Sequence, residues 1–171
     1  MAHAQQATKE FSVPTEETDK QRFVRMEAIQ KKIQEGGERL YRQRTEFCST
    51  EDIGWYAEVR VEQALRVLKK SRPFHLLNQI QRTTRSGKQD SNGVDIYITF
   101  WGRSMRIPLQ VKSSKKDKKS FQVKFRNKGD PIRVILCPLS MSHEKLLKEV
   151  EEVVKNIYKT HGLKIHGLEV N

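Results

Sequence analysis

The chain has 171 residues, with 33 lysines and arginines against 21 acidic residues and a formal net charge of +12. This length suits a single domain with a hydrophobic core, and the charge favours a polyanionic partner, nucleic acid ahead of a membrane surface. Two cysteines and no apolar run near the roughly 18 residues of a membrane span exclude a disulfide scaffold, a cysteine-based zinc site and a membrane protein. We expect a cytoplasmic protein, with a nucleoid or nuclear location left open.

The N-terminal third divides into a tail and a helical extension. Residues 1–14 are polar and aperiodic and predict a disordered tail that is not a secretory signal. Residues 15–48 predict a helical extension that is capped by Thr15 and interrupted at Gly36 and Gly37. Its apolar stripe predicts a helix that packs or binds a partner: Phe23, Met26, Ile29 and Ile33.

Residues 49–171 have the pattern of an α/β domain. A helix opens at Ser49 or Thr50 and closes with Lys69 and Lys70, and residues 74–84 predict a first strand. Strict alternation predicts two further strands, and a continuous apolar run predicts a buried strand before the closing helix. Between them, Phe121, Val123 and Phe125 alternate like a strand, but Phe121 and Phe125 also share a helix face, so we expect a short helix that ends at Gly129. These elements span 94–101, 105–112, 115–129, 132–139 and 142–162. The fold class is therefore α/β, with a mixed sheet flanked by helices.

The two alternating strands predict a hairpin whose register brings polar residues together. If the loop is Gly102-Arg103, paired residue numbers sum to 205, so Asp95 faces Gln110. Lys112 lies two residues further along, on the same side of the sheet. An acid, an amide and an ammonium then meet at one end of the hairpin.

This set of groups suits a divalent cation beside a phosphodiester. Mg²⁺, or Mn²⁺ in its place, prefers oxygen ligands, which Asp95 and the Gln110 amide would supply. Metal coordination lowers the pKa of a bound water, and Lys112 can orient that water or stabilise charge on the phosphate. Taken singly, each residue has a structural reading, as a turn residue or an ordinary surface lysine.

The motifs in chain order resemble the PD-(D/E)xK nuclease superfamily, which has the restriction-endonuclease-like fold. They are "GWYAE" on the leading helix, "GVDIYI" on one strand and "LQVKSS" on the next. The first is similar to a motif of Holliday junction resolvases, and the Q-x-K form is similar to Mrr-like nucleases. The resemblance implies a DNA endonuclease, and many such enzymes are homodimers, which leaves a homodimer open.

The resemblance also implies a fourth group, a carboxylate on the leading helix that helps to bind the metal. Helical periodicity puts Glu58 at the edge of the apolar face and Glu62 about 40° further towards solvent, so we expect Glu58 to be this group. The sequence departs from the pattern where Val94 stands in place of a proline and where uncharged Gln110 stands in place of an acid. Because Gln110 carries no charge, a catalytically inactive DNA-binding protein of the same fold stays an alternative.

Basic residues surround the expected site. Those predicted to contact nucleic-acid phosphates lie before the second strand and after the third: Arg82, Arg85, Lys88, Lys115, Lys116, Lys118, Lys119, Lys124 and Arg126. The main hypothesis is metal-dependent hydrolysis of DNA, with RNA not excluded. Two alternatives stay open: a catalytically inactive nucleic-acid-binding module of the same fold, and an assembly protein that uses the N-terminal helix.

Overall fold

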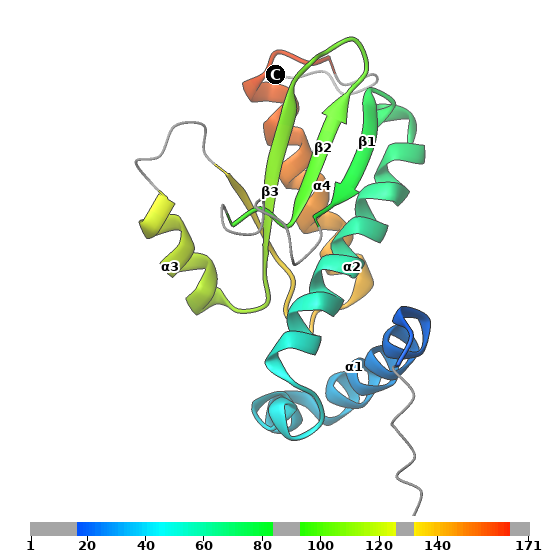
Figure 1. The fold of residues 1–171 in the computed structure, drawn as a ribbon, viewed down its shortest axis with the longest axis vertical. Coiled ribbons are helices and arrows are strands. Elements are labelled where there is room, and N and C mark those ends of the chain that lie inside the picture. Colours follow the sequence, from blue (N-terminus) through cyan, green and yellow to red (C-terminus); the bar gives the residue numbers. More distant parts are fainter. Residues whose placement is uncertain (1–16, 84–92, 126–131, 165–171) are drawn as a thin grey trace, which may run out of the picture.

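The structure, a computed structural model, describes residues 17–83, 93–125 and 132–164. It has four α-helices and four strands within this part, besides two short 3-10 helices, which confirms the α/β class and the mixed sheet flanked by helices (Figure 1). In chain order the elements are α1 (Asp19–Arg42), α2 (Thr50–Lys70), β1 (Leu77–Arg82), β2 (Ile96–Phe100), β3 (Arg106–Lys112), α3 (Lys115–Phe125), β4 (Arg133–Leu136) and α4 (His143–Thr160). None of the helices among these residues is long and apolar enough to cross a bilayer. The predicted tail, 1–14, lies outside the described residues.

The sheet has the strand order β1-β2-β3-β4. The first two pairs are antiparallel and β3 pairs with β4 in parallel. Alternate residues of β2 and β3 are buried with one face of α2 and one face of α4 in a single core, so both helices cover the same side of the sheet. The alternation read from the sequence is confirmed: Ile96, Ile98, Phe100, Ile107, Leu109 and Val111 all point into this core.

The predicted register of the hairpin is confirmed, although its loop is wider than expected. Ile96 pairs with Leu109 and Ile98 with Ile107, so the residue numbers sum to 205 along the ladder. The strands, however, end at Phe100 and resume at Arg106, leaving five residues between them instead of two. Gly102 has a φ of +70°, a left-handed conformation that glycine adopts without a steric penalty.

Helix α1 begins later than the sequence pattern suggested. Its N-cap is Thr18 and not Thr15, because the Thr18 hydroxyl accepts the backbone N–H of Gln21 and the Gln21 side chain accepts the N–H of Thr18. The predicted interruption is confirmed at Gly37, where the backbone leaves the helical conformation with a φ of 61°. The apolar stripe of α1 packs on the N-terminal half of α2 in a second core that includes Met26 and Tyr56.

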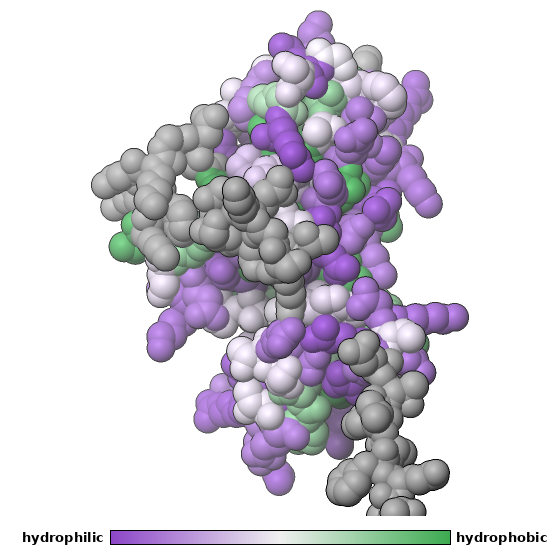
Figure 2. Space-filling model, viewed as in Figure 1, coloured by the Kyte–Doolittle hydropathy of each residue, from purple (hydrophilic) through white to green (hydrophobic). Residues whose placement is uncertain are grey.

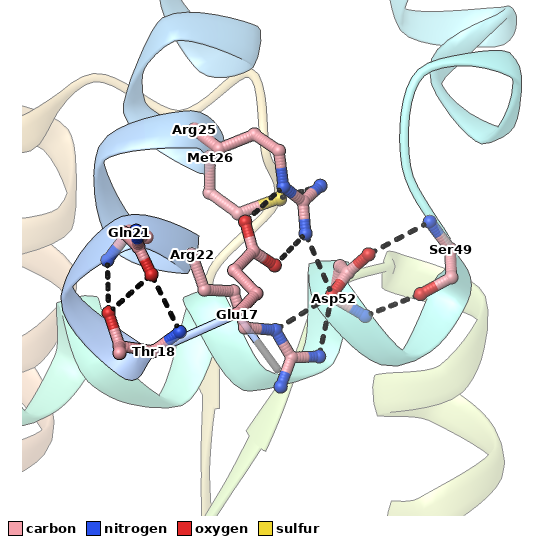
Figure 3. Close-up of polar contacts among 8 residues, drawn as sticks. All are labelled: Glu17, Thr18, Gln21, Arg22, Arg25, Met26, Ser49 and Asp52. Carbon is pink, nitrogen blue, oxygen red and sulfur yellow. Dashed lines mark hydrogen bonds and ion pairs between the residues drawn. The ribbon is translucent and has the colours of Figure 1, made fainter. Parts of the chain in front are cut away.

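A polar cluster fixes the start of α1 to the start of α2 (Figure 3). The Arg22 guanidinium lies 2.6 Å from the Asp52 carboxylate, and Arg25 bridges Asp52 and Glu17. Burial raises the pKa of Asp52, but the hydrogen bonds from Ser49 and Arg22 outweigh it, so the pKa lies below its ordinary value. The cluster therefore stabilises the packing of α1 at neutral pH and loses this contribution as the pH falls through the lowered pKa.

A buried arginine joins α2 to the turn between β4 and α4. Arg60 is 5% exposed, and its guanidinium donates to the carbonyls of Met141 at 2.6 Å and Pro138 at 3.4 Å. Gln30 of α1 donates to the same Met141 carbonyl at 2.8 Å. One carbonyl therefore holds three elements together. Arg60 also lies 3.6 Å from the sulfur of Cys137, a thiol whose burial raises its pKa to about 11.

We expect Arg60→Ala to lower the free energy of unfolding by about 2–3 kcal/mol, because it removes charge-assisted hydrogen bonds between a buried guanidinium and the turn before α4. Urea denaturation would measure the change. Arg66→Ala is the matched control on the same helix: Arg66 is exposed and pairs with Glu62, so its loss should cost about 0.5 kcal/mol or less. Equal effects of the two substitutions would contradict the role given to Arg60.

Candidate functional site

The structure brings the four expected site residues to one cavity of about 530 Å³. Glu58, Asp95, Gln110 and Lys112 all line it. The cavity lies at the end of the β2–β3 hairpin that is remote from its turn, between α2 and the start of α3. Other residues complete the lining: Gly54, Ala57, Gly93, Val111, Ser113, Asp117, Ser120 and Phe121.

Asp95 takes its position from the end of the β2–β3 ladder. Regular pairing stops at Ile96 and Leu109, and the Asp95 N–H donates to the Leu109 carbonyl at 2.9 Å. The Asp95 carboxylate accepts the backbone N–H of Val111 at 2.6 Å. A side-chain oxygen therefore accepts a strand N–H where the ladder ends, which holds the carboxylate in one orientation at the cavity.

Gln110 is a buried polar residue with only part of its hydrogen-bonding capacity used. It is 5% exposed, and its amide nitrogen donates to the Asp95 carboxylate and to the Val111 carbonyl. Its amide oxygen has no hydrogen-bond partner in the described part of the chain. A buried acceptor without a partner costs free energy, about 1–3 kcal/mol, in this orientation of the amide.

The donor set fits a hard divalent cation if the Gln110 amide turns. Two carboxylates and one amide oxygen are ligands that Mg²⁺ and Mn²⁺ accept. A half-turn of the amide exchanges its oxygen and nitrogen, and a cation beside Asp95 would favour the orientation that directs the oxygen to it. The described residues contain no cluster of three histidine, cysteine or acidic side chains that could hold a metal, so the fit depends on Gln110.

The choice between the two carboxylates of α2 agrees with their surroundings. Glu58 lines the cavity with Asp95 and also borders an adjoining pocket, whereas Glu62 lines the adjoining pocket alone. In that pocket Glu62 forms an ion pair with Arg66 at 2.7 Å and lies 3.8 Å from Arg82. Of the two carboxylates, one helical turn apart, Glu58 is therefore the one that lies at the candidate site.

One face of α3 also lines the cavity, which was not expected from the sequence. Asp117, Ser120 and Phe121 lie on one face of this helix, and the Asp117 carboxylate accepts the Ser114 hydroxyl at 2.6 Å. The i, i+3, i+4 spacing of these residues was the available signal. It was hidden in a segment whose alternating apolar residues also resemble a strand.

The basic residues expected to contact phosphates have different environments. Lys115, Lys116 and Lys119 are exposed on α3. On the face seen in Figure 2, the described residues are mostly hydrophilic. Lys118 is instead paired with Glu149 of α4 at 3.0 Å. Arg82 lies over the Trp55 ring at 5.9 Å, partly buried. The remaining predicted contacts lie outside the described side chains: Arg85, Lys88, Lys124 and Arg126.

The cavity combines carboxylates with an ammonium that can meet a phosphate. Glu58, Asp95 and Asp117 line it, although the three do not form a metal-binding cluster among the described residues, and Lys112 supplies the positive charge. No family model, curated protein or solved structure matches this chain. What this site can do chemically therefore follows from the positions of its side chains.

We expect Gly93→Ala to disturb the cavity more than its matched control, Gly102→Ala. Both glycines have a φ near +70°, so each substitution should cost about 1–2 kcal/mol in backbone strain. A Cβ at Gly93 would lie 2.9 Å from the Phe121 ring and 3.4 Å from the Gln110 amide oxygen, whereas one at Gly102 would meet nothing within 4 Å. Crowding should add about 1 kcal/mol or more at Gly93, measurable by urea denaturation. Equal costs would contradict the close packing at Gly93.

Proposed function

We propose that this chain is a metal-dependent nuclease that hydrolyses phosphodiester bonds of DNA. The observation that carries the proposal is the meeting of Glu58, Asp95, Gln110 and Lys112 in one cavity. Glu58, Asp95 and Gln110 would hold Mg²⁺ or Mn²⁺. The bound metal would lower the pKa of a water molecule and offset charge on the phosphate.

The residues themselves have separate tasks in this proposal. The Val111 N–H fixes the Asp95 carboxylate, so that it need not reorganise when substrate enters. The Lys112 ammonium, at the end of β3, would stabilise negative charge that develops on the phosphate oxygens. Gln110 would contribute an oxygen without adding a second buried charge next to Asp95.

The surface beside the cavity supports a nucleic-acid substrate. Exposed Lys115, Lys116 and Lys119 lie on the helix that follows Lys112 directly. Contacts from such lysines to phosphates supply affinity without reading sequence, and they weaken as salt increases. The choice of DNA over RNA comes from the family resemblance, because phosphate contacts do not distinguish the sugars.

The hydrogen bond from Gln110 to Asp95 favours a second candidate function. With the Gln110 amide nitrogen towards Asp95, a cation bound at Asp95 would meet N–H groups, which cannot coordinate it, instead of an oxygen lone pair. A chain that keeps this arrangement would bind DNA without cleaving it. The two candidates differ in whether Mg²⁺ brings strand cleavage.

We expect wild-type protein to nick plasmid or branched DNA with Mg²⁺ or Mn²⁺ and to stop when EDTA is added. Glu58→Ala and Asp95→Ala should each reduce the rate at least about 100-fold, because each removes a metal ligand. Glu62→Ala, one helical turn from Glu58 and outside the cavity, is the matched control and should leave the rate within about threefold. Single-stranded DNA and RNA complete the substrate panel.

Cleavage that survives EDTA, or that Asp95→Ala retains, would contradict the proposal. DNA binding that depends on salt but brings no cleavage with either metal would instead support the inactive module.

We expect Gln110→Glu to lower stability in the absence of metal and to increase stabilisation by Mg²⁺. Two carboxylates in contact raise the pKa of one of them above its unfolded value of about 4. The stability of the variant relative to wild type should therefore be highest below about pH 4 and fall by about 1–3 kcal/mol as the pH rises through the raised pKa. Thermal unfolding against pH, with and without Mg²⁺, measures both effects.

Gln122→Glu, which adds the same charge at an exposed position of α3, is the control and should show neither effect. A Gln110→Glu protein that Mg²⁺ does not stabilise would contradict a cation site at this position.

A further inference from the structure

Lys112 is held at the cavity by an aromatic ring. Its ammonium lies 4.9 Å from the centroid of the Phe121 ring. Across residues 17–83, 93–125 and 132–164, Lys112 forms no ion pair with a carboxylate. A lysine side chain is long and flexible, so a group that acts on one phosphate oxygen needs something to limit its positions.

The ring itself has little freedom to move. Phe121 is 8% exposed, and its Cε2 and Cζ atoms pack against Gly93 so closely that a Cβ there would lie 2.9 Å away. Gly93 has a φ of +69°, so the backbone approaches the ring where other residues would be strained. Lys118, on the same helix, is tied to Glu149 of α4. The ring therefore presents a fixed face to Lys112.

An aromatic face differs from a carboxylate as a partner for a catalytic ammonium. The ring attracts the cation through its quadrupole without cancelling its charge. It also accepts no conventional hydrogen bond, so the N–H groups that point away from the ring stay available to a ligand. A carboxylate in the same place would hold Lys112 but would compete with the phosphate for it.

We infer that Phe121 is a positioning residue that holds the Lys112 ammonium towards the phosphate during cleavage, an inference that rests on the proposed function. Phe121 would act through Lys112 and would not itself contact the reacting atoms. Its loss should lower the rate of the chemical step and leave the affinity for DNA nearly unchanged.

Graded fluorination of this one ring tests the inference with little change in its volume. We expect 4-fluoro-, 3,5-difluoro- and 3,4,5-trifluorophenylalanine at position 121 to reduce the single-turnover cleavage rate stepwise. The trifluoro ring and Phe121→Leu should each lose about tenfold, with unchanged Kd for DNA. Val123→Ala, at a position 77% exposed on the same helix, should have no effect on rate. A merely structural role predicts no gradient with fluorination.

NMR of the side chain gives a measurement that does not need activity. In wild-type protein the ε-methylene protons of Lys112 should show an upfield ring-current shift that Phe121→Leu abolishes. Absence of this shift, or a cleavage rate that fluorination leaves unchanged, would overturn the inference alone. A wild-type protein that has the shift but cleaves nothing with either metal would overturn the proposed function and with it the cleavage role of Phe121.

Discussion

The candidate site depends on one constraint, the register between β2 and β3. Side chains of a strand alternate between its two faces, so a slip of one residue would send Asp95 and Gln110 to opposite sides of the sheet. The ladder from Ile96–Leu109 to Thr99–Arg106 fixes this register, and the apolar face of both strands enforces it by burial. The same pairing therefore builds the core on one face and assembles the polar cavity at the end of the other.

The cavity lies where regular pairing of β2 and β3 ends, so polar side chains fit there and bond backbone groups that have no partner on the neighbouring strand. Beyond Ile96 the Asp95 carboxylate accepts the Val111 N–H that the neighbouring strand leaves unpaired, while β3 continues alongside β4. Gln110 fills the space between this carboxylate and Gly93 at the cost of one buried amide oxygen without a partner among the described groups. Under the proposed function, a cation that turned the amide oxygen towards it would offset this cost.

Helix α2 connects this site to the N-terminal extension. One side of α2 packs on the sheet, and its first turns pack on α1 through a separate apolar cluster. Glu58 projects from the half of α2 that α1 and the Arg22–Asp52 contact hold in place. Arg60, two residues further along α2, joins the same helix to the turn before α4 through its hydrogen bond to the Met141 carbonyl. The extension is thus part of what positions the cavity wall, in addition to any role it has with a partner.

Sequence by itself determined the elements and the register. Apolar alternation identified β2 and β3, and a turn centred on Gly102-Arg103 gave the pairing in which residue numbers sum to 205. Helical periodicity separated Glu58 from Glu62. Alternation and helical periodicity are repeats along the chain, so the sequence alone shows them. Tertiary structure alone decided that Thr18 caps α1 and that the turn between β2 and β3 spans five residues. It also decided that the Gln110 amide nitrogen faces Asp95. Likewise, only the structure placed the Phe121 ring against the Lys112 ammonium. These contacts join groups from elements distant in sequence or choose among local options of similar energy, so no periodic pattern encodes them.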